Sequence, residues 1–145
     1  MSIDKQWIFD SQRQTWLQLS LEEQVRQQLV DYLCNDLGFP KSLVVTEKSL
    51  SQFPHLKNIS ELPKRRIDIV CFAKNIHPKH ELYPLLLIEC KGKADLNEKV
   101  KRQLLGYNHY VQAYYVAMAN EQNLQTGWYD SKCKEYRFVP YLPTY

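Results

Sequence analysis

Three side chains in the middle of the sequence could together support metal-assisted hydrolysis. Residues 83–93 (YPLLLIECKGK) form an apolar run that ends in Glu89, Cys90 and Lys91, and such a run predicts a buried strand. Residues two apart in a strand point to the same face, so we expect Glu89 and Lys91 to project together while Cys90 turns the other way. Burying a carboxylate and an ammonium at the end of a strand is costly unless something binds them. The preceding predicted strand supplies a second carboxylate, Asp68.

This pair of carboxylates suits a magnesium ion. Mg²⁺ takes oxygen ligands and keeps several waters, so one or two carboxylates and a substrate phosphate suffice to hold it. Asp68 and Glu89, on neighbouring predicted strands, would be those ligands, with Mn²⁺ as a substitute cation. The ion can lower the pKa of a water and polarise a phosphoryl oxygen, and Lys91 can orient or deprotonate the nucleophile. The pattern therefore predicts hydrolysis of a phosphodiester by a metal-activated water.

The position of the E-x-K tripeptide carries more information than its spacing. A D-x-K copy occurs at residues 130–132 (DSK), in a predicted hairpin turn where polar residues need no explanation. Glu89 instead ends a predicted strand, beside a strand with an otherwise unexplained Asp68. A structural alternative stays open, in which Asp68 and Glu89 each pair with a nearby base, Arg66 or Lys91.

A predicted helix before these strands contributes a further acidic candidate. Ser20 and Glu23 have the spacing of a capping box, which predicts a helix that starts at Ser20 and ends at Gly38. Its apolar stripe consists of Val25, Leu29, Leu33 and Leu37. Capping accounts for Glu23, whereas Glu22 lies over the stripe at about 100° per residue and is expected to point inward. Glu22 could supply a further metal ligand or hold a metal-bound water, and pairing with Arg26 is the structural alternative.

A second predicted helix carries a polar residue within its apolar stripe. Asp95 and Glu98 form another capping box, which predicts a helix to about Gln112. The stripe consists of Leu96, Val100, Leu104, Tyr107 and Val111, with Gln103 on the same side. A buried amide needs partners, which a carboxylate site or a DNA phosphate could provide. The Q-x-x-x-Y spacing of Gln103 occurs twice elsewhere in the chain, so a core Gln and a core Tyr are the alternative.

The remaining segments predict an α/β domain with a mixed sheet. Residues 6–19 predict an N-terminal hairpin, residues 43–50 a strand with Glu47, and residues 51–64 a loop or flexible insertion. Further strands are predicted at residues 66–73 and 114–119, and a closing hairpin at residues 128–129 and 136–141. The order predicts a mixed central sheet flanked by helices, with N- and C-terminal β-hairpins.

Composition restricts the protein class. The 145 residues, 44% of them hydrophobic and 24% charged, predict one globular domain over residues 1–145. No apolar run reaches the roughly 18 residues that span a bilayer and no leader opens the chain, so we expect no membrane partner and a cytoplasmic location. The net charge of +3 permits an acidic partner without requiring one. The four cysteines form no C-x-x-C pair and are expected to be reduced core residues, and the four histidines show no metal-ligand spacing.

On these residues the chain resembles the PD-(D/E)xK nuclease superfamily. More narrowly, it resembles stand-alone proteins similar to the N-terminal nuclease domain of type I restriction enzyme R subunits. The matching segments are residues 19–33 (LSLEEQVRQQLVDYL), 38–48 (GFPKSLVVTEK), 64–70 (KRRIDIV), 85–93 (LLLIECKGK), 103–107 (QLLGY) and 138–145 (FVPYLPTY). The resemblance implies a restriction-endonuclease-like fold and a Mg²⁺-dependent (endo)deoxyribonuclease, with its metal-binding and catalytic elements on Asp68, Glu89 and Lys91.

The resemblance also places the remaining site residues. The helical acidic residue of the family falls on Glu22 or Glu23, and the capping argument selects Glu22. The Q-x-x-x-Y helix falls on Gln103 and Tyr107. The residues expected to contact DNA are Arg66, Lys93, Gln103 and Tyr107.

The chain departs from the family pattern at four places. Leu21 stands where the family often has proline, Gly92 and Lys93 replace Ala-Pro, residues 118–120 replace Thr-Asn-Gly, and the insertion at residues 51–64 is long. No helicase motor follows, so a larger restriction or helicase complex is not implied by this chain alone. A homodimer would be the simplest arrangement for two cuts in a duplex. DNA or RNA as substrate and endo- or exonuclease action stay open, and the alternative function is a catalytically silent DNA-binding or protein-interaction module.

Overall fold

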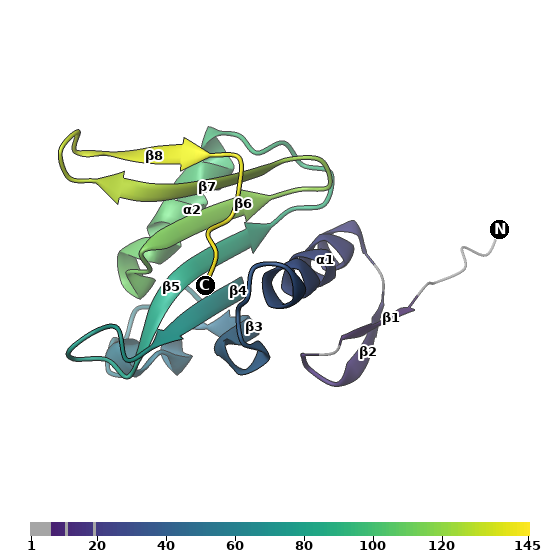
Figure 1. Cartoon of the computed structure of the whole chain (residues 1–145), viewed down its shortest axis with the longest axis horizontal. Helices are drawn as coiled ribbons and strands as arrows, with labels where there is room; N and C mark the ends of the chain where they lie inside the picture. Colours follow the sequence, from purple (N-terminus) through teal and green to yellow (C-terminus); the bar gives the residue numbers. More distant parts are fainter. Residues whose placement is uncertain (1–6, 11, 19) are drawn as a thin grey trace.

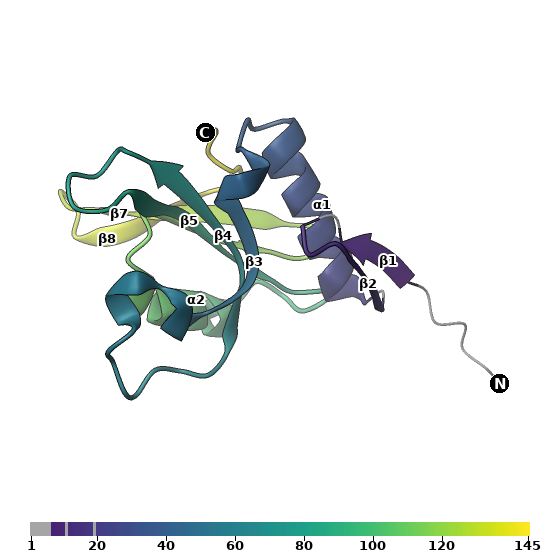
Figure 2. The ribbon, with the colours of Figure 1, turned by 90° about the horizontal axis from the view of Figure 1, so that it is seen from below.

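A six-stranded sheet lies between two helices, which gives the fold three layers (Figures 1 and 2). The structure, a computed structural model, describes residues 7–10, 12–18 and 20–145. Its helices and strands are β1 (Trp7–Asp10), β2 (Thr15–Gln18), α1 (Leu21–Asn35), β3 (Val44–Ser49), β4 (Arg66–Lys74), β5 (Leu82–Cys90), α2 (Glu98–Val111), β6 (Tyr115–Ala119), β7 (Leu124–Asp130) and β8 (Glu135–Val139). Short 3₁₀ turns occur at Lys41–Leu43, Leu50–Gln52 and Pro54–Leu56.

Each strand of the large sheet lies beside its neighbour in the sequence. The order is β3-β4-β5-β6-β7-β8, while β1 and β2 form a separate hairpin. β5 and β6 are parallel, because α2 carries the chain back across one face, and the other neighbouring strands are antiparallel. The predicted α/β class with a mixed sheet is confirmed. The restriction-endonuclease-like character of the fold stays a prediction.

Alternate residues of β5 divide the core into two halves. Leu86, Ile88 and Cys90 pack in the cluster that contains the buried side chains of α1, whereas Leu87 packs in the cluster that contains those of α2. Figure 2 shows the two helices on opposite faces of the sheet. The prediction that Cys90 turns to the side opposite Glu89 is therefore confirmed.

The two helices begin and end differently from the prediction. Ser20 caps α1 as predicted, since its side chain accepts the Glu23 backbone N–H at 3.1 Å. α1 ends before Gly38, which lies in the following turn with a φ of +81°. The prediction that Asp95 caps α2 is wrong: Asn97, directly before the helix, accepts the Val100 N–H at 3.1 Å. Asn97 occupies the position from which a short side chain reaches the third residue of a helix.

The insertion at residues 51–64 is packed at its start rather than being a flexible loop. Phe53 is 1% exposed and Leu56 is 3% exposed, and both join the core on the α2 face. Leu50, Phe53 and Leu56 are three residues apart, and side chains with this spacing align on one side of a 3₁₀ turn. The sequence therefore contained the signal for these turns.

The four cysteines are all free, and they differ in burial. Cys71 and Cys90 are buried as predicted, but Cys133 is exposed and accepts a hydrogen bond from Arg137 at 3.0 Å. Within the described residues, no helix has the length and apolar character needed to cross a membrane.

Candidate active site

The candidate carboxylates lie where β4 and β5 stop pairing. The backbone ladder between these strands ends at Ile69 and Ile88, beyond which β4 pairs with β3 and β5 pairs with β6. Asp68 provides a side-chain partner at this point, because its Oδ2 accepts the Cys90 backbone N–H at 2.8 Å. The Asp68 carboxylate is thereby fixed beside the backbone that carries Glu89.

Glu89 is enclosed but short of partners. It is 1% exposed, and its Oε1 has no hydrogen-bond partner within the described residues. Burial, followed by the negative charge of Asp68, raises the pKa of Glu89 to about 8. Burial also raises the pKa of Asp68 to about 6, with a contribution from the charge of Glu22. An added positive charge would favour the ionised form of both carboxyl groups.

This donor set fits a divalent cation that prefers oxygen. Two carboxylates can hold Mg²⁺ when waters and a substrate phosphate complete its shell. Such a cation would bind the unpartnered oxygen of Glu89. Its charge would also lower the raised pKa values of both carboxyl groups. Over residues 7–10, 12–18 and 20–145, no group of three or more His, Cys, Asp or Glu side chains is placed to hold a metal ion. Asp68 and Glu89 would therefore be a minimal ligand set.

Three of the predicted site residues form one hydrogen-bonded row. Lys91 Nζ donates to Gln103 Oε1 at 3.4 Å, and Gln103 Nε2 donates to the Tyr107 hydroxyl at 3.5 Å. Tyr107 is buried, while Lys91 and Gln103 are half-buried. Burial raises the pKa of Glu89, and the positive charge of Lys91 offsets part of this rise. The row therefore joins α2 to the side of β5 that carries the acidic group.

Of the two glutamates at the start of α1, Glu23 is the buried one and Glu22 is not. Glu23 is 6% exposed and pairs with Arg26, whereas Glu22 is exposed. The inward positions of the helix include Glu23, Arg26, Gln27, Val30 and Leu33. The prediction that Glu22 points inward is wrong, because the buried face of α1 extends from the expected Val25 and Leu33 toward Glu23 and Arg26 and not toward Glu22. Glu22 still borders the site, since its charge contributes to the raised pKa of Asp68 and of Glu89.

Gly92 allows α1 to approach the end of β5. A Cβ at Gly92 would lie 2.9 Å from the Leu21 Cβ and 3.2 Å from the Glu22 backbone nitrogen. Leu21 and Gly92 are two of the positions at which the sequence departs from the family pattern, and the structure brings them into contact. This close approach sets the first turn of α1, with Glu22, beside the site.

An ion-pair network that the sequence did not predict lies behind Asp68. Arg26 Nη1 lies 3.6 Å from Asp68 Oδ1, and the same guanidinium pairs with Glu23 and Glu47. Arg13, from the turn of the β1–β2 hairpin, extends the network to Glu23 at 3.0 Å. The available signal was Arg26 itself, a basic residue within the inward stripe of α1. Among the ion pairs of the described residues, Arg26 is thus the basic side chain that lies nearest to Asp68.

The predicted DNA contacts Arg66 and Lys93 are both exposed. Arg66 Nη1 lies 3.6 Å from Glu47 Oε2, so its ion pair is with Glu47 and not with Asp68. The structural alternative, in which Arg66 neutralises Asp68, is therefore wrong for the described part of the chain. Both basic side chains are accessible to a phosphate backbone.

Comparison with known proteins identifies the family. A family model described as the N terminus of the type I restriction enzyme R protein matches residues 21–143. The chain belongs to this family. All the predicted site residues lie within the matched range. The match confirms the resemblance to the N-terminal domain of type I restriction enzyme R subunits that the sequence indicated. No curated protein and no solved structure gives a significant match, and membership of the PD-(D/E)xK superfamily stays a prediction.

Proposed function

We propose that this R-protein N-terminal domain is a Mg²⁺-dependent deoxyribonuclease with a PD-(D/E)xK-type site on a restriction-endonuclease-like fold. The observation that carries the proposal is the pair of buried carboxylates at the end of the β4–β5 ladder. Asp68 is anchored on the Cys90 N–H, and Glu89 has an unpartnered oxygen beside Lys91. Two buried acids without sufficient neutralising partners destabilise the protein alone and favour the binding of a cation.

Asp68 and Glu89 would hold the ion, and Mn²⁺ would substitute for Mg²⁺. When bound, the ion would polarise the scissile phosphate and acidify the attacking water. The hydrogen bond from Cys90 keeps the Asp68 carboxylate oriented, so little reorganisation is needed when the ion arrives. Glu22, exposed at the first turn of α1, would accept hydrogen bonds from water at the edge of the site.

Lys91 would orient the nucleophilic water and offset the charge that develops on the phosphate. Its ammonium is held by Gln103, and Gln103 is held in turn by Tyr107. The row restricts the rotamers of a long side chain, which is the usual requirement for precise positioning. Gln103 and Tyr107 are therefore proposed as positioning residues that also border the DNA.

DNA is the proposed substrate because the family name refers to restriction enzymes. Arg66 and Lys93 are exposed near the two carboxylate-bearing strand ends and would contact backbone phosphates. A homodimer would supply one site for each strand of a duplex, and the location would be cytoplasmic.

The test is cleavage of plasmid and linear DNA with Mg²⁺ or Mn²⁺ by wild type, Asp68→Asn, Glu89→Gln and Lys91→Ala. Each variant should lose activity by about 100-fold or more. Lys132→Ala is the matched control, because Lys132 belongs to the exposed D-x-K copy between β7 and β8 and should leave cleavage unchanged. Equal cleavage by wild type and all variants would refute the assignment of the site.

Calorimetry separates an enzyme from a silent module. Uptake of Mn²⁺ that disappears in Asp68→Asn and in Glu89→Gln supports the proposed site. DNA binding by wild type without metal uptake would instead assign the chain to the DNA-binding modules.

A further inference from the structure

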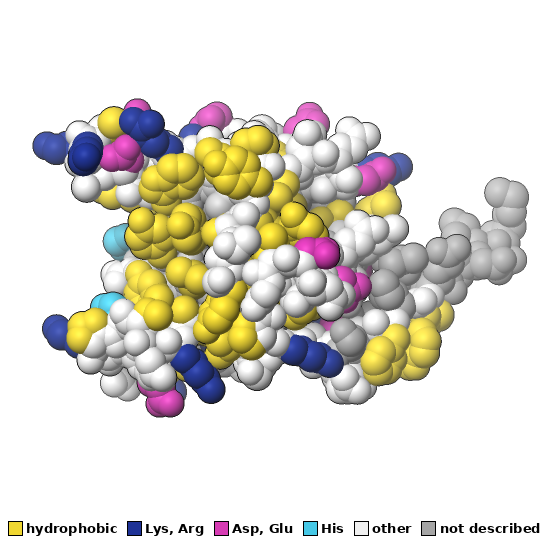
Figure 3. All heavy atoms as spheres, viewed as in Figure 1, with side chains coloured by type: hydrophobic (Ala, Val, Ile, Leu, Met, Phe, Trp, Pro, Cys, Tyr) yellow, Lys and Arg dark blue, Asp and Glu magenta, His cyan; other side chains and the backbone are white. Residues whose placement is uncertain are grey.

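The sheet face that carries α1 is only half covered. α1 lies over β3, β4, β5 and part of β6, and leaves the β7–β8 side of this face without a helix (Figures 1 and 2). Figure 3 shows hydrophobic side chains gathered over this open half, with Lys and Arg side chains at the end where β7 turns into β8. Tyr115, Trp128 and Arg137 are consecutive cross-strand partners, so their side chains share one face.

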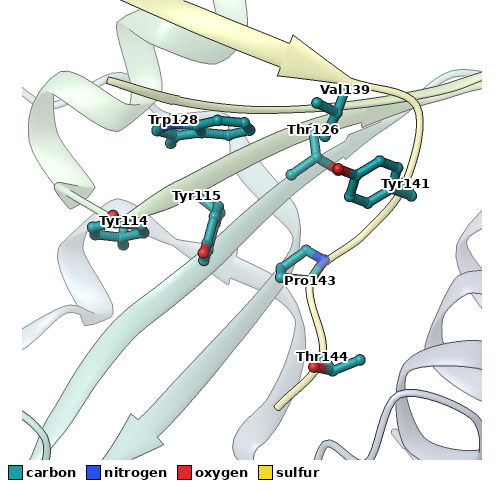
Figure 4. A pocket seen from close by; sticks show the side chains of 8 residues that line it. All are labelled: Tyr114, Tyr115, Thr126, Trp128, Val139, Tyr141, Pro143 and Thr144. Carbon is teal, nitrogen blue, oxygen red and sulfur yellow. The ribbon is translucent and has the colours of Figure 1, made fainter. Parts of the chain in front are cut away.

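A cavity of about 370 Å³ lies between this open face and the C-terminal tail. Its lining includes Tyr114, Tyr115, Thr126, Trp128, Val139 and Tyr141, and we refer to it as the aromatic pocket. Figure 4 shows the rings of Trp128 and Tyr115 on one side of the hollow, with Tyr141 and Pro143 of the tail on the other. The volume lies within the range of small-molecule sites.

The pocket contains an orphaned hydroxyl group. Thr126 is 1% exposed, it lines the pocket, and its Oγ1 has no hydrogen-bond partner in the described part of the chain. A buried hydroxyl without a partner costs free energy that a bound donor or acceptor would recover. A purely apolar ligand could not form a hydrogen bond with this hydroxyl, so the pocket favours a ligand with polar atoms.

The other lining residues define the shape of that ligand. Tyr115 and Trp128 meet edge to face with ring centroids 6.5 Å apart, an arrangement that leaves a ring face of the pair open to stacking. Tyr114 and Tyr141 are exposed by 54% and 64%. No residue that lines the pocket is charged. A planar, neutral heterocycle that both stacks and hydrogen-bonds satisfies all of these features.

We propose that the aromatic pocket binds an unpaired nucleobase of single-stranded DNA, which rests on the proposed function for the choice of DNA. Aromatic side chains on a sheet are a stacking surface for unpaired bases. Arg137 is the cross-strand partner of Trp128, and its side chain, 55% exposed in its ion pair with Asp130, would contact the phosphate that follows the base. The pocket would therefore hold a displaced or frayed strand and not an intact duplex.

The aromatic pocket is separate from the candidate active site. Glu89 pairs with Met118 on β6, whereas the pocket residue Thr126 pairs with Ala117, which alternates with Met118 and so faces the other side of the sheet. Tyr115 packs with the α1-side core, while Leu87, which shares its face with Glu89, belongs to the α2-side core. Substitutions in the pocket can thus be separated from losses at the carboxylates.

The experiment follows Trp128 fluorescence in full-length protein carrying Trp7→Phe and Trp16→Phe. A 12-nucleotide oligothymidylate and a duplex of equal length are titrated in EDTA, so that binding is measured without metal-dependent cleavage. The single strand should quench Trp128. Fluorescence anisotropy of a fluorescein-labelled oligothymidylate, which needs no tryptophan in the protein, should show binding to Trp128→Ala weakened at least about fivefold. Thr126→Val keeps the size of the side chain and should weaken binding about two- to tenfold. Tyr129→Ala is the matched control, because Tyr129 is exposed on the opposite face of β7 and should leave the affinity unchanged.

The outcomes are distinct from those of the nuclease test. Equal affinity for single strand and duplex, or equal effects of Thr126→Val and Tyr129→Ala, would overturn the nucleobase proposal even if the chain cleaves DNA. Concentration-dependent dimerisation that Thr126→Val abolishes, with no fluorescence response to DNA, would assign the pocket to a second copy of the chain and also overturn it. Quenching by the single strand in a protein that does not cleave DNA would support the pocket and refute the nuclease.

Discussion

Two groups of buried or half-buried acids are linked through Arg26 in this fold, and they have opposite electrostatic surroundings. In the first group, burial would raise the pKa of Asp10 and of Glu47, but hydrogen bonds and charges from arginines leave both lowered. In the second group, burial prevails, and the pKa values of Asp68 and Glu89 are raised. The arginines Arg13 and Arg26 serve the first group directly, and Arg26 approaches the second only at 3.6 Å from Asp68.

The comparison distinguishes structural acids from acids that await a ligand. A buried carboxylate that is paired with a guanidinium and hydrogen-bonded holds elements together, as Asp10 does at the β1–β2 turn. Glu89 lacks such a pair, so its burial is favourable only when another cation or a proton neutralises it. Arg26 lies between the groups, and it ties the position of Asp68 to that of α1.

The largest expected effect follows from removing the shared arginine. Arg26→Met keeps most of the buried stem but removes the guanidinium that pairs with Glu23 and Glu47 and lies near Asp68. We expect a loss of about 3–5 kcal/mol in the free energy of unfolding, measured by urea denaturation. Arg137→Met is the control, because Arg137 is 55% exposed in its pair with Asp130 and its removal should leave the free energy of unfolding nearly unchanged. Similar losses in both variants would contradict the distinction between a buried network and a surface pair.

Metal binding should stabilise only through the second group of acids. Mn²⁺ at 100 times its dissociation constant should raise the free energy of unfolding by about 2.7 kcal/mol. Asp68→Asn and Glu89→Gln should abolish this gain, whereas Asp10→Asn should lower stability and keep the gain. The measurement is urea denaturation with and without Mn²⁺. If Asp10→Asn alone lost the stabilisation by Mn²⁺, the cation would bind at the first group of acids, which would contradict its assignment to Asp68 and Glu89.

The raised pKa of Glu89 predicts a pH dependence in the absence of metal. The folded protein retains a proton on Glu89 up to a pKa of about 8, whereas the unfolded chain releases it near the ordinary value of 4.5. The folded state therefore binds more protons in this window, so stability is full below pH 4.5 and falls as the pH rises towards 8. The slope from this group should be at most about 1.4 kcal/mol per pH unit. Denaturation of Glu89→Gln should lack this contribution, and an unchanged slope would contradict the raised pKa.

The smallest expected effect is at the surface end of the network. Arg66 is 64% exposed in its pair with Glu47, so Arg66→Ala should cost less than about 1 kcal/mol of stability. The same variant should weaken DNA binding and reduce its salt dependence by about one counterion. A large loss of stability would show that Arg66 belongs to the structural group and not to the DNA contacts.

The sequence determined the parts of the site that depend on strand parity. Side chains two apart share a face in any regular strand, so the orientation of Cys90 followed from local pattern. The position of Asp68 on the neighbouring strand was also predicted, because short connections favour antiparallel neighbours. Local pattern succeeded here because each inference needed only the geometry of one element or one adjacent pair.

Only the tertiary structure decided how the helices are turned and what surrounds the acids. The packing of α1 on the sheet, with its close contact at Gly92, decides that Glu23 is buried and Glu22 is exposed. The network around Arg26 joins elements that are far apart in the sequence, so no spacing could reveal it. The sequence names which residues can carry charge, but the partners that neutralise a buried charge are brought together by folding.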